Sequence, residues 1–469
     1  MRIGIVGAGA TGTSVLDTLA RLLPDGAAVT VFEGDRYFGP GRAYRPGSGA
    51  ALVNLTAPKM SLRPDQPGHF QDWLPADHPE FVSRELYGRY LTELFTDAAD
   101  RLGATLIGEY VVAIARVDGS YVVRTGQAAF TFDAVFLCVG AATPSDVYEL
   151  AGTPGFVADP YPLDTMPSLS PEASVTVLGT GLSAVDAVLE LIQRGHRGRL
   201  RMVSRSGYLP GVRDTRTKPV LRSTGAEVTK ELSLLDLYRM VSGEFRAQKI
   251  PMTELWQEFQ SGEDPAARLR RQYGQVLAGA PALPVFLAVA GHLLEHQAWR
   301  LFGDETRAVF LRDWHGLVAT LCAPMPARTA RRLVGLLDDG LLRVSAGLTG
   351  IHAHHNGYTV STGQGDFETS YVVNTIRPNP VPLPGRAAEL IGSLLAGELA
   401  DTHPLGGLRL DAETATALDG TGMPSPGLYV LGELAIGELY VETTVLTAIT
   451  HRVGQAVHHL LGRSSKGAA

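Results

Sequence analysis

The chain has 469 residues, so two or three domains are expected, because single hydrophobic cores rarely grow beyond roughly 250–300 residues. Hydrophobic residues make up 45% and charged residues 19%, which fits a globular protein and excludes a disordered chain. The net charge of −7 argues against a general attraction to nucleic acid or to acidic membranes.

Other features of the sequence bear on where the protein works. No apolar run reaches the roughly 18 residues of a transmembrane helix, and the nearest, 283–294, is short and contains Gly291 and His292. The N-terminus leads directly into an apolar run, without the pattern of a signal peptide. Two cysteines exclude a disulfide framework. We therefore expect a reduced, cytoplasmic setting.

A glycine-rich turn stands close to the N-terminus. Gly-Ala-Gly-Ala-Thr-Gly at 7–12 follows the apolar run 3–6 and opens a helical pattern at 15–23. A second strand, 29–32, ends at Glu33, about 20 residues beyond the last glycine, where a carboxylate reaches the ribose of a bound adenosine. The alternative for Glu33 is a solvated strand end. The pattern predicts a dinucleotide site, with FAD as its ligand.

The same arrangement returns later in the chain. Gly-Thr-Gly-Leu-Ser-Ala at 179–184 follows the apolar run 175–178 and opens a helical pattern at 185–192. One such turn is a weak signal, but two, each between a strand and a helix, are a strong one. The next strand, 200–203, ends at Ser204-Arg205 with no carboxylate, and an arginine there can accept the 2′-phosphate of NADP. A solvated Arg205 is the alternative.

The remaining segments place these turns in domains. Residues 39–74 are rich in Pro and Gly and predict a long ordered loop, and loops of this length are usually functional. A helix at 83–102 and strands at 121–125 and 134–139 follow, the last running into Gly140. Residues 218–337 carry successive helical patterns, at 232–246, 265–277, 285–302, 305–318 and 329–337. Short strands return from 341 to 374, and 427–461 reads as strand, loop and long helix.

The predicted fold class is α/β, with two Rossmann-like dinucleotide-binding domains, for FAD and NADP, and an all-α insertion. The expected FAD domain comprises 1–170 and 376–469, the NAD(P) domain 171–217 and 338–375, and the insertion 218–337.

Several tempting features have plain explanations. His352, His354 and His355 precede an Asn-Gly turn and indicate a solvated strand end rather than a metal site. Cys138 lies in an apolar strand and is expected to be a core residue, and Cys322 has no second cysteine nearby. A basic run is compatible with gripping an NADP phosphate or an acidic substrate, or with a solvated loop; it comprises Arg213, Arg216, Lys218 and Arg222.

An ordered series of motifs resembles the FAD/NAD(P)-binding oxidoreductases related to flavin-dependent N-hydroxylating monooxygenases. The resemblance covers nearly the whole chain and is specific for the family but not for a substrate. The chain departs from the usual pattern at Glu433, where such flavoproteins usually place Asp, and at Ala184, a tolerated variant of the last glycine. The motifs that carry the resemblance are 39–44, 53–55, 60–62, 70–74, 87–91, 204–207, 431–433 and 438–443.

The resemblance implies an FAD-dependent, NADPH-using monooxygenase that N-hydroxylates a small amine or amino acid through a flavin peroxide. Its expected partners are that substrate and molecular oxygen, with neither nucleic acid nor a membrane, and a homodimer is compatible with the sequence. In such an enzyme the cofactor supplies the chemistry, so no nucleophilic triad is expected. Two alternatives stay open: a flavin amine or alcohol oxidase or dehydrogenase, and a non-enzymatic flavin-binding redox sensor.

The predicted site residues follow from the turns and the motifs. The loop 54–63 is the candidate surface against the isoalloxazine ring, with a plain connector as the alternative, and a helix starting near Thr443 is expected to point its N-terminus at the flavin. Lys59 and Tyr440 are the candidates for the substrate side, and no metal is expected. The residues expected to bind the cofactors are Gly7, Gly9, Ala10, Thr11, Gly12, Glu33, Arg42, Asn54, Met60, Ser61, Gly140, Gly179, Gly181, Ser183, Ser204, Arg205, Gly432, Glu433, Glu442 and Thr443.

Overall fold

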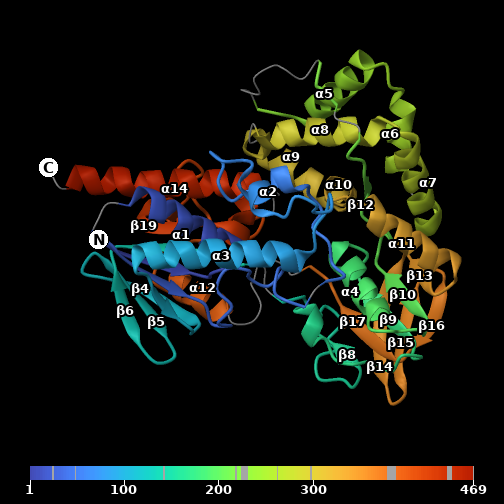
Figure 1. Ribbon diagram of the computed structural model, residues 1–469, viewed down its shortest axis with the longest axis horizontal. Coiled ribbons are helices and arrows are strands. Elements are labelled where there is room, and N and C mark those ends of the chain that lie inside the picture. Colours follow the sequence, from blue (N-terminus) through green and yellow to red (C-terminus); the bar gives the residue numbers. More distant parts are fainter. Residues whose placement is uncertain are drawn as a thin grey trace. The chain divides into compact units, whose positions relative to one another are not determined.

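The computed structural model shows two compact units (Figure 1). The first comprises Met1–Gly49, Leu55–Thr143 and Pro378–Ala469, and the second comprises Ala50–Asn54 and Pro144–Arg377. The division at 143 falls ahead of the expected boundary at 170, and it groups the helical segment 218–337 with the second nucleotide-binding segment. The structure describes residues 1–23, 26–47, 49–140, 143–216, 219–222, 231–260, 262–295, 298–377, 387–440 and 446–467.

The first unit is built on a six-stranded sheet in the order β18-β19-β7-β1-β2-β3. All neighbours pair in parallel except β18 and β19, so the carboxyl ends of β19, β7, β1 and β2 meet at one edge. The central strands are buried apolar runs, as expected for strands covered on both faces. The strands are β1 (Arg2–Val6), β2 (Ala28–Phe32), β3 (Thr105–Ile107), β7 (Ala134–Leu137), β18 (Thr416–Leu418) and β19 (Pro424–Val430).

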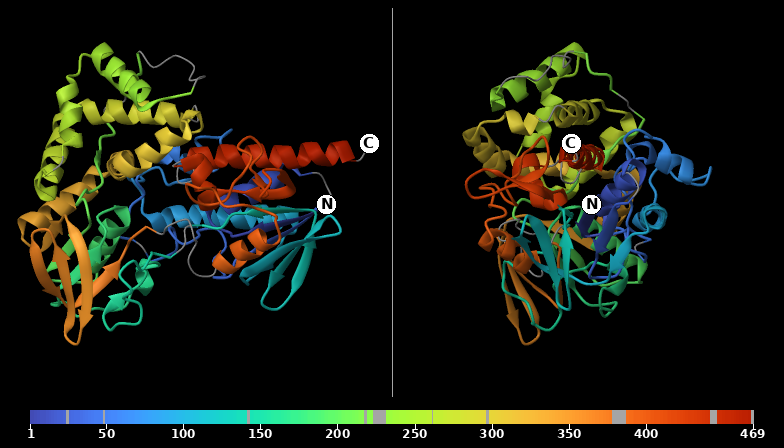
Figure 2. Two further views of the ribbon diagram at one scale, coloured as in Figure 1. Left: turned by 180° about the vertical axis from the view of Figure 1, so that it is seen from behind. Right: turned by 90° about the vertical axis from the view of Figure 1, so that its left-hand side faces the viewer.

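Helices cover this sheet. The helix α1 packs against both α3 and α14, and Figure 2 shows α14 running alongside it. Ser83 caps α3 by accepting a hydrogen bond from the Leu86 amide, and Gly103 ends that helix in the left-handed conformation. A separate antiparallel sheet of β4, β5 and β6 packs against α12. The bounds are α1 (Ala10–Leu22), α2 (His69–Trp73), α3 (Arg84–Leu102), α12 (Ala387–Ala396), α13 (Ile436–Leu439), α14 (Leu446–Gly467), β4 (Val111–Val117), β5 (Ser120–Thr125) and β6 (Ala129–Phe132).

The second unit has a parallel five-stranded sheet in the order β13-β10-β9-β17-β8. Its helix α4 (Leu182–Gln193) follows β9 directly. An antiparallel sheet of β14, β15 and β16 and a short parallel pair, β11 and β12, complete the strands. The bounds are β8 (Phe156–Val157), β9 (Val175–Leu178), β10 (Leu200–Val203), β11 (Val212–Arg213), β12 (Met325–Pro326), β13 (Leu342–Ser345), β14 (Leu348–His354), β15 (Gly357–Thr362), β16 (Gly365–Thr369) and β17 (Tyr371–Asn374).

The helical segment of the second unit is largely as predicted, with one helix divided and one added. The helix expected at 285–302 is α8, followed by a separate 3-10 turn, Ala298–Leu301. The helix expected at 305–318 contains a π-helical stretch, Phe310–Trp314, between α9 and α10. The helix α6 was not predicted. The bounds are α5 (Leu234–Ala247), α6 (Met252–Phe259), α7 (Pro265–Ala278), α8 (Ala282–Glu295), α9 (Asp304–Val309), α10 (His315–Cys322) and α11 (Ala327–Asp338).

Within the described residues, no single helix has the length and apolarity needed to cross a membrane. One pair of helices, Pro265–Ala278 with Ala282–Leu293, meets the length and composition criteria together, but it is bent by 91°.

Candidate functional site: two dinucleotide-binding edges

The first glycine turn lies between β1 and α1, as predicted. Gly7 has a φ of +97°, and a Cβ on it would lie 2.6 Å from the carbonyl oxygen of Cys138 on the neighbouring strand. A Cβ on Gly12 would lie 2.0 Å from the carbonyl oxygen of Gly7. Both positions therefore require glycine, because the helix begins directly against the turn. Gly9 is the N-cap of α1 and no side chain caps the helix, so its N-terminal amides face the turn.

Glu33 lies at the end of β2 and is joined to this turn. Its Oε2 accepts a hydrogen bond from the Ala8 amide at 3.0 Å, and its Oε1 accepts one from the Asp35 amide at 3.3 Å. Burial raises the pKa of Glu33, although both backbone hydrogen bonds oppose that shift. The carboxylate is thus fixed at the edge of the sheet rather than solvated, where the sequence predicts contact with a ribose.

A second glycine segment faces the first. The Gly39 amide donates to the carbonyl of Ala8 at 2.8 Å, and the Thr13 hydroxyl donates to the carbonyl of Gly39 at 3.3 Å. Gly41 has a φ of +56°, and a Cβ built on Gly9 would lie 3.4 Å from its Cα. Arg42, the predicted cofactor residue that follows, is partly buried. Two bare backbone segments therefore frame the N-terminus of α1, which fits a pyrophosphate.

Two further predicted segments reach the same edge. The Leu431 amide donates to the carbonyl of Leu137 at 3.0 Å, so the chain beyond β19 stays beside β7. Gly432, with a φ of +67°, lies at the start of α1, since a Cβ on it would be 3.4 Å from the Thr11 hydroxyl. Glu433 follows it directly, and Gly140 is exposed beyond β7. The structure thus brings Gly7 to Gly12, Glu33, Gly140, Gly432 and Glu433 to one edge.

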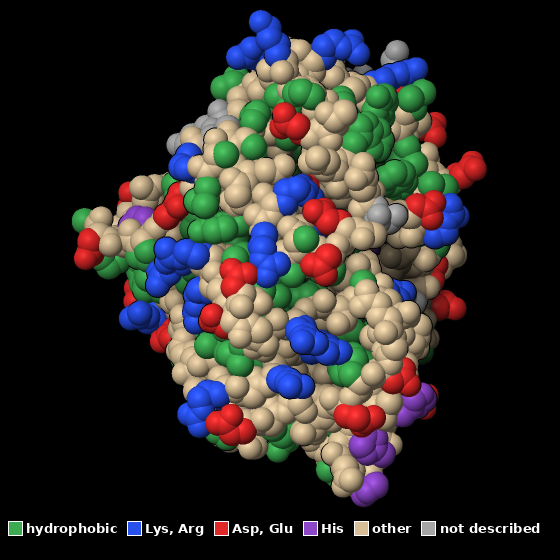
Figure 3. All heavy atoms as spheres, turned by 90° about the vertical axis from the view of Figure 1, so that its right-hand side faces the viewer, with side chains coloured by type: hydrophobic (Ala, Val, Ile, Leu, Met, Phe, Trp, Pro, Cys, Tyr) green, Lys and Arg blue, Asp and Glu red, His purple; other side chains and the backbone are tan. Residues whose placement is uncertain are grey.

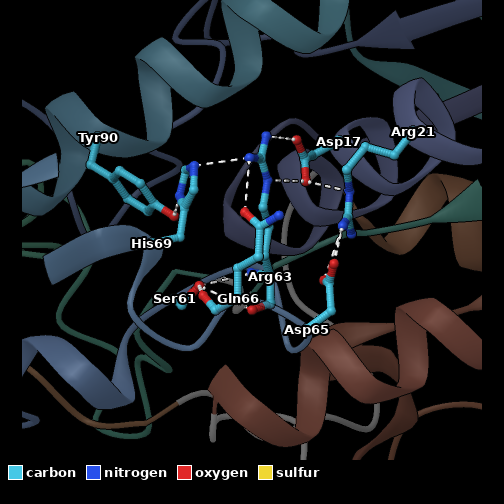
Figure 4. Close-up of polar contacts among 8 residues, drawn as sticks. All are labelled: Asp17, Arg21, Ser61, Arg63, Asp65, Gln66, His69 and Tyr90. Carbon is cyan, nitrogen blue, oxygen red and sulfur yellow. Dashed lines mark hydrogen bonds and ion pairs between the residues drawn. The ribbon is translucent and has the colours of Figure 1, made fainter. Parts of the chain in front are cut away.

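A buried ion pair, which the sequence analysis missed, fixes the loop after Leu55 to α1 (Figure 4). The Arg63 guanidinium donates to both carboxylate oxygens of Asp17, with Nε–Oδ2 at 3.0 Å and Nη2–Oδ1 at 2.6 Å. Asp17 is only 1% exposed. Arg21 lies 3.3 Å from the same carboxylate and bonds Asp65 at 2.8 Å. The signal in the sequence that could have indicated this pair is Asp17 itself, a carboxylate among the residues that α1 buries.

The hydrogen bonds continue from Arg63 to α3 and determine the state of His69. The Arg63 Nη1 lies 2.9 Å from the His69 Nε2, and the His69 Nδ1 lies 2.8 Å from the Tyr90 hydroxyl (Figure 4). Because a guanidinium only donates, His69 Nε2 must accept, and its proton sits on Nδ1. Burial and then the Arg63 charge lower the pKa of His69. We call Asp17, Arg63, His69 and Tyr90 the loop anchor.

The residues of loop 54–63, the candidate surface against the isoalloxazine ring, differ in how they are held. Met60 is buried, and its carbonyl accepts from the Tyr87 hydroxyl at 3.0 Å. The Ser61 hydroxyl bonds within the loop, to the carbonyls of Arg63 and Gln66. Lys59, by contrast, is exposed. Asn54 belongs to the second unit.

The other substrate-side candidate has an unusual backbone. Tyr440 ends α13 with a φ of +51° and a ψ of −128°, a conformation that residues with a Cβ rarely adopt. Such strain clusters at functional sites. The predicted residues Glu442 and Thr443 lie outside the described residues.

The second glycine turn lies between β9 and α4. Gly179 has a φ of +109°, and a Cβ on it would lie 2.6 Å from the Thr375 hydroxyl. Gly181, the exposed N-cap of α4, would meet no protein atom within 4 Å if it had a Cβ. The protein alone gives no steric reason for that glycine, whereas close approach of a phosphate does. Ser183 follows in the first turn of α4 and is partly buried.

The end of β10 lies beside this turn. The Thr180 hydroxyl is 2.9 Å from the Ser204 hydroxyl and donates to the carbonyl of Tyr208 at 2.7 Å. The Ser204 hydroxyl also accepts from the Gly207 amide at 2.9 Å. Arg205 is exposed directly after Ser204. A cation thus stands at the second turn in the place that Glu33 takes at the first.

The histidines and cysteines form no further site in the described part of the chain. His352, His354 and His355 are exposed on the β14–β15 hairpin, and Figure 3 shows histidines at one lower corner of the face it draws. The sequence placed no carboxylate beside them, but the Glu368 Oε2 lies 2.7 Å from the His354 Nε2. No group of three ligands able to hold a metal occurs among the described residues. Cys138 is a buried core residue, and burial raises the pKa of its thiol.

Comparison with known proteins gives the family of the first edge and the fold of the chain. Residues 4–142 match the FAD-NAD(P)-binding family model. In sequence, the chain matches none of the curated proteins with which it was compared.

Solved structures match over nearly the full length. L-lysine 6-monooxygenase from Pseudomonas syringae matches with a TM-score of 0.60 at 16% identity, covering 98% of this chain and 99% of that one. Ornithine N-hydroxylase from Kutzneria sp. 744 matches with a TM-score of 0.57 at 14% identity, covering 99% of each chain. Bacillithiol disulfide reductase from Staphylococcus aureus matches with a TM-score of 0.50 at 12% identity, covering 99% and 98%. Residues 4–142 therefore match the FAD-NAD(P)-binding family, and the chain as a whole has the fold of solved N-hydroxylating flavin monooxygenases.

Proposed function

We propose that the protein is an FAD-dependent monooxygenase that uses NADPH and N-hydroxylates a small amine or amino acid. The observation that carries this proposal is the presence of two glycine turns, each at the carboxyl edge of its own parallel sheet. A carboxylate stands at the first edge and a guanidinium at the second. Two edges of opposite charge suit two different dinucleotides.

The residues of each edge have distinct roles in this proposal. When bound, FAD supplies the redox chemistry, taking a hydride from the nicotinamide and activating molecular oxygen. Gly7 to Gly12 and the N-terminus of α1 hold its pyrophosphate, and Glu33 holds the ribose of its adenosine. Gly181 admits the pyrophosphate of NADPH, and Arg205 binds its 2′-phosphate.

The fold alone allows other flavoprotein activities, since a disulfide reductase shares it. The cysteines argue against a dithiol mechanism in this chain. The sequence has two, Cys138 and Cys322, which are far apart along the chain, and both are free. Cys138 is buried beneath the first turn, and its raised thiol pKa disfavours the thiolate that exchange requires. Monooxygenase and oxidase or dehydrogenase activities remain the competing flavin reactions.

Isotope labelling separates these reactions. With ¹⁸O₂ and a panel of small amines and amino acids, a monooxygenase puts one labelled oxygen atom into the product for each NADPH consumed. An oxidase releases all of the consumed oxygen as hydrogen peroxide and labels no product. If the second outcome is obtained with a substrate that stimulates oxygen uptake, the protein is an oxidase and the proposal is wrong.

Lys59 and Tyr440 provide a test of the site itself. An oxygenating flavin site must exclude water, and both candidates belong to segments that we propose as its walls. Lys59→Ala and Tyr440→Ala should raise hydrogen peroxide released per NADPH while flavin content stays at the wild-type level. If both variants release the same amount of hydrogen peroxide per NADPH as the wild type, these segments do not line the site.

A further inference from the structure

An arginine in the second unit, Arg213, is half-buried and has no charged partner among the described residues. Arg213 is the second residue of β11, next to the fully buried Val212, and its Nε is shielded from solvent and forms no hydrogen bond. Within the described part of the chain, its side chain takes part in no hydrogen bond or ion pair. Arg21, Arg45 and Arg268 also have a buried Nε without a hydrogen bond, but each forms an ion pair through another nitrogen. Arg213 is thus set apart from them.

The neighbours of Arg213 do not neutralise it. The Asp214 Oδ1 accepts from the backbone amide of Arg216 at 2.9 Å and lies 3.4 Å from the Arg216 Nε. The Cys322 thiol is the titratable group that Arg213 influences, and burial raises the pKa of that thiol to about 12, so it stays protonated. Burial also lowers the pKa of Arg213, the direction expected for a cation placed in an apolar setting.

Holding a cation in a partly buried position without a counter-charge costs stability, because burial removes part of its hydration. Arginine is also the side chain best suited to bind carboxylate or phosphate, because its planar fork donates two parallel hydrogen bonds. The local structure is well held: the Gly211 amide donates to the carbonyl of Thr320 at 3.0 Å, and the Met325 amide donates to that of Gly211 at 2.7 Å. The backbone next to Arg213 is therefore fixed to β12 and to the end of α10.

The position of Arg213 along the chain connects it to the second nucleotide-binding edge. Tyr208, whose carbonyl accepts from Thr180 in the glycine turn, precedes β11 by a few residues. The helical segment begins shortly after β11, and after α10 the chain forms β12, which pairs with β11. Along the chain, Arg213 therefore lies between the residues of the nucleotide-binding edge and the helical segment.

We propose that Arg213 is an anion-binding residue that takes an oxyanion, either the carboxylate of an amino-acid substrate or a phosphate of the nicotinamide dinucleotide. The carboxylate source rests on the proposed function, whereas the binding of an anion does not. No covalent step is involved.

The anion site is tested without turnover, by thermal unfolding of the FAD-loaded full-length protein. Inorganic phosphate and succinate serve as probes at constant ionic strength. Arg213→Met keeps the length of the side chain and removes its charge, so it should raise the Tm without anions and abolish the rise that the anions produce in the wild type. Arg213→Lys should keep part of that rise. Arg216→Met, at a neighbouring arginine that is 58% exposed, should behave as the wild type.

Two further measurements distinguish the sources of the anion. If the source is the nucleotide, Arg213→Met should weaken NADP⁺ binding roughly ten- to hundredfold, as expected for a lost charge-assisted contact. If the source is the substrate, NADP⁺ binding should be unchanged, and KM should rise by that factor for an amino acid but not for its decarboxylated amine. An Arg213→Met variant that is less stable than the wild type without anions, or that keeps the full anion response, would overturn the proposal even if ¹⁸O₂ labelling succeeds.

Discussion

The two glycine turns of this protein follow the same sequence pattern but differ in how closely the helix approaches. At the first turn, a Cβ on Gly12 would lie 2.0 Å from the carbonyl oxygen of Gly7. At the second turn the corresponding residue is Ala184, which is fully buried and fits. The last position of the pattern therefore needs glycine only where the helix lies very close to the turn. The middle glycine, Gly9 or Gly181, is instead needed so that the ligand can approach the backbone.

The charged residues beside the two turns, Glu33 and Arg205, also differ in whether the protein itself uses them in a hydrogen bond. Glu33 accepts a hydrogen bond from the first turn, so its carboxylate belongs to the structure of that turn as well as to the proposed ribose contact. At the second turn, hydroxyl groups of Thr180 and Ser204 make the internal contacts and leave Arg205 exposed. The first edge is therefore constrained by its acidic residue, and the second keeps its basic residue available for a phosphate.

The largest effect should come from adding one methyl group to the first turn. Gly12→Ala should abolish FAD binding, because the new Cβ collides with backbone that cannot move without displacing α1. The matched change at the second turn, Ala184→Gly, should cost only about 0.5–1 kcal/mol of stability and leave FAD bound. Flavin absorbance of the purified variants measures both. Full flavin content in Gly12→Ala would contradict the comparison of the two turns.

A smaller but still large effect is expected at the loop anchor. Arg63→Met should destabilise the protein by roughly 3–5 kcal/mol, because it leaves the buried carboxylate of Asp17 with only the more distant Arg21. Arg197→Met provides the control, since the Arg197–Glu172 pair is 71% and 68% exposed and should contribute about 0–1 kcal/mol. Urea unfolding followed by tryptophan fluorescence gives both values. Equal losses in the two variants would mean that the anchor is no stronger than a surface pair.

The charge at the second edge should control the choice of nucleotide. Arg205→Ala should reduce the preference for NADPH over NADH by roughly tenfold or more, the effect of a lost charge-assisted contact of about 1.5–3 kcal/mol. Flavin content should not change, because Arg205 belongs to the second unit and FAD is assigned to the first. The ratio of kcat/KM for the two nucleotides, measured by flavin reduction, provides the test. An unchanged ratio would remove Arg205 from the nucleotide site.

The smallest effect should be a dependence of stability on pH. The pKa of His69 is lowered from 6.5 in the folded protein, so below about pH 6.5 the unfolded chain takes up a proton that the folded one resists. Stability should therefore fall as the pH drops from 6.5 towards 5. His69→Gln should flatten this part of the profile, measured by urea unfolding at a series of pH values. A wild-type slope that survives in His69→Gln would assign it to other groups.

The sequence predicted the features that depend on neighbours along the chain. Both glycine turns, the strands leading into them and Glu33 were placed correctly because a strand, a turn and a helix form one local unit. Gly432 was expected to bind a cofactor because it belongs to a family motif, and the parallel pairing of β19 with β7 brings the end of β19, which precedes it, to this edge.

What the sequence could not predict depends on contacts between distant segments. Asp17 gains its partner from Arg63, which lies beyond a long loop, and no periodicity records that pairing. The helix expected at 285–302 ends at Glu295, because an apolar pattern gives helical spacing but not the residue where the helix stops. The missing partner of Arg213 is likewise a property of the folded unit, since a basic run looks the same whether its members are paired or not.

Ala8 shows how the first turn would behave while the flavin is being taken up. Its amide is held by Glu33 and its carbonyl by the Gly39 amide, so the protein itself supplies both hydrogen bonds that shape the turn. A binding loop whose geometry is set in advance loses little conformational entropy when its ligand arrives. Protein stripped of flavin should therefore keep a competent cradle, and added FAD should restore the holoprotein without refolding.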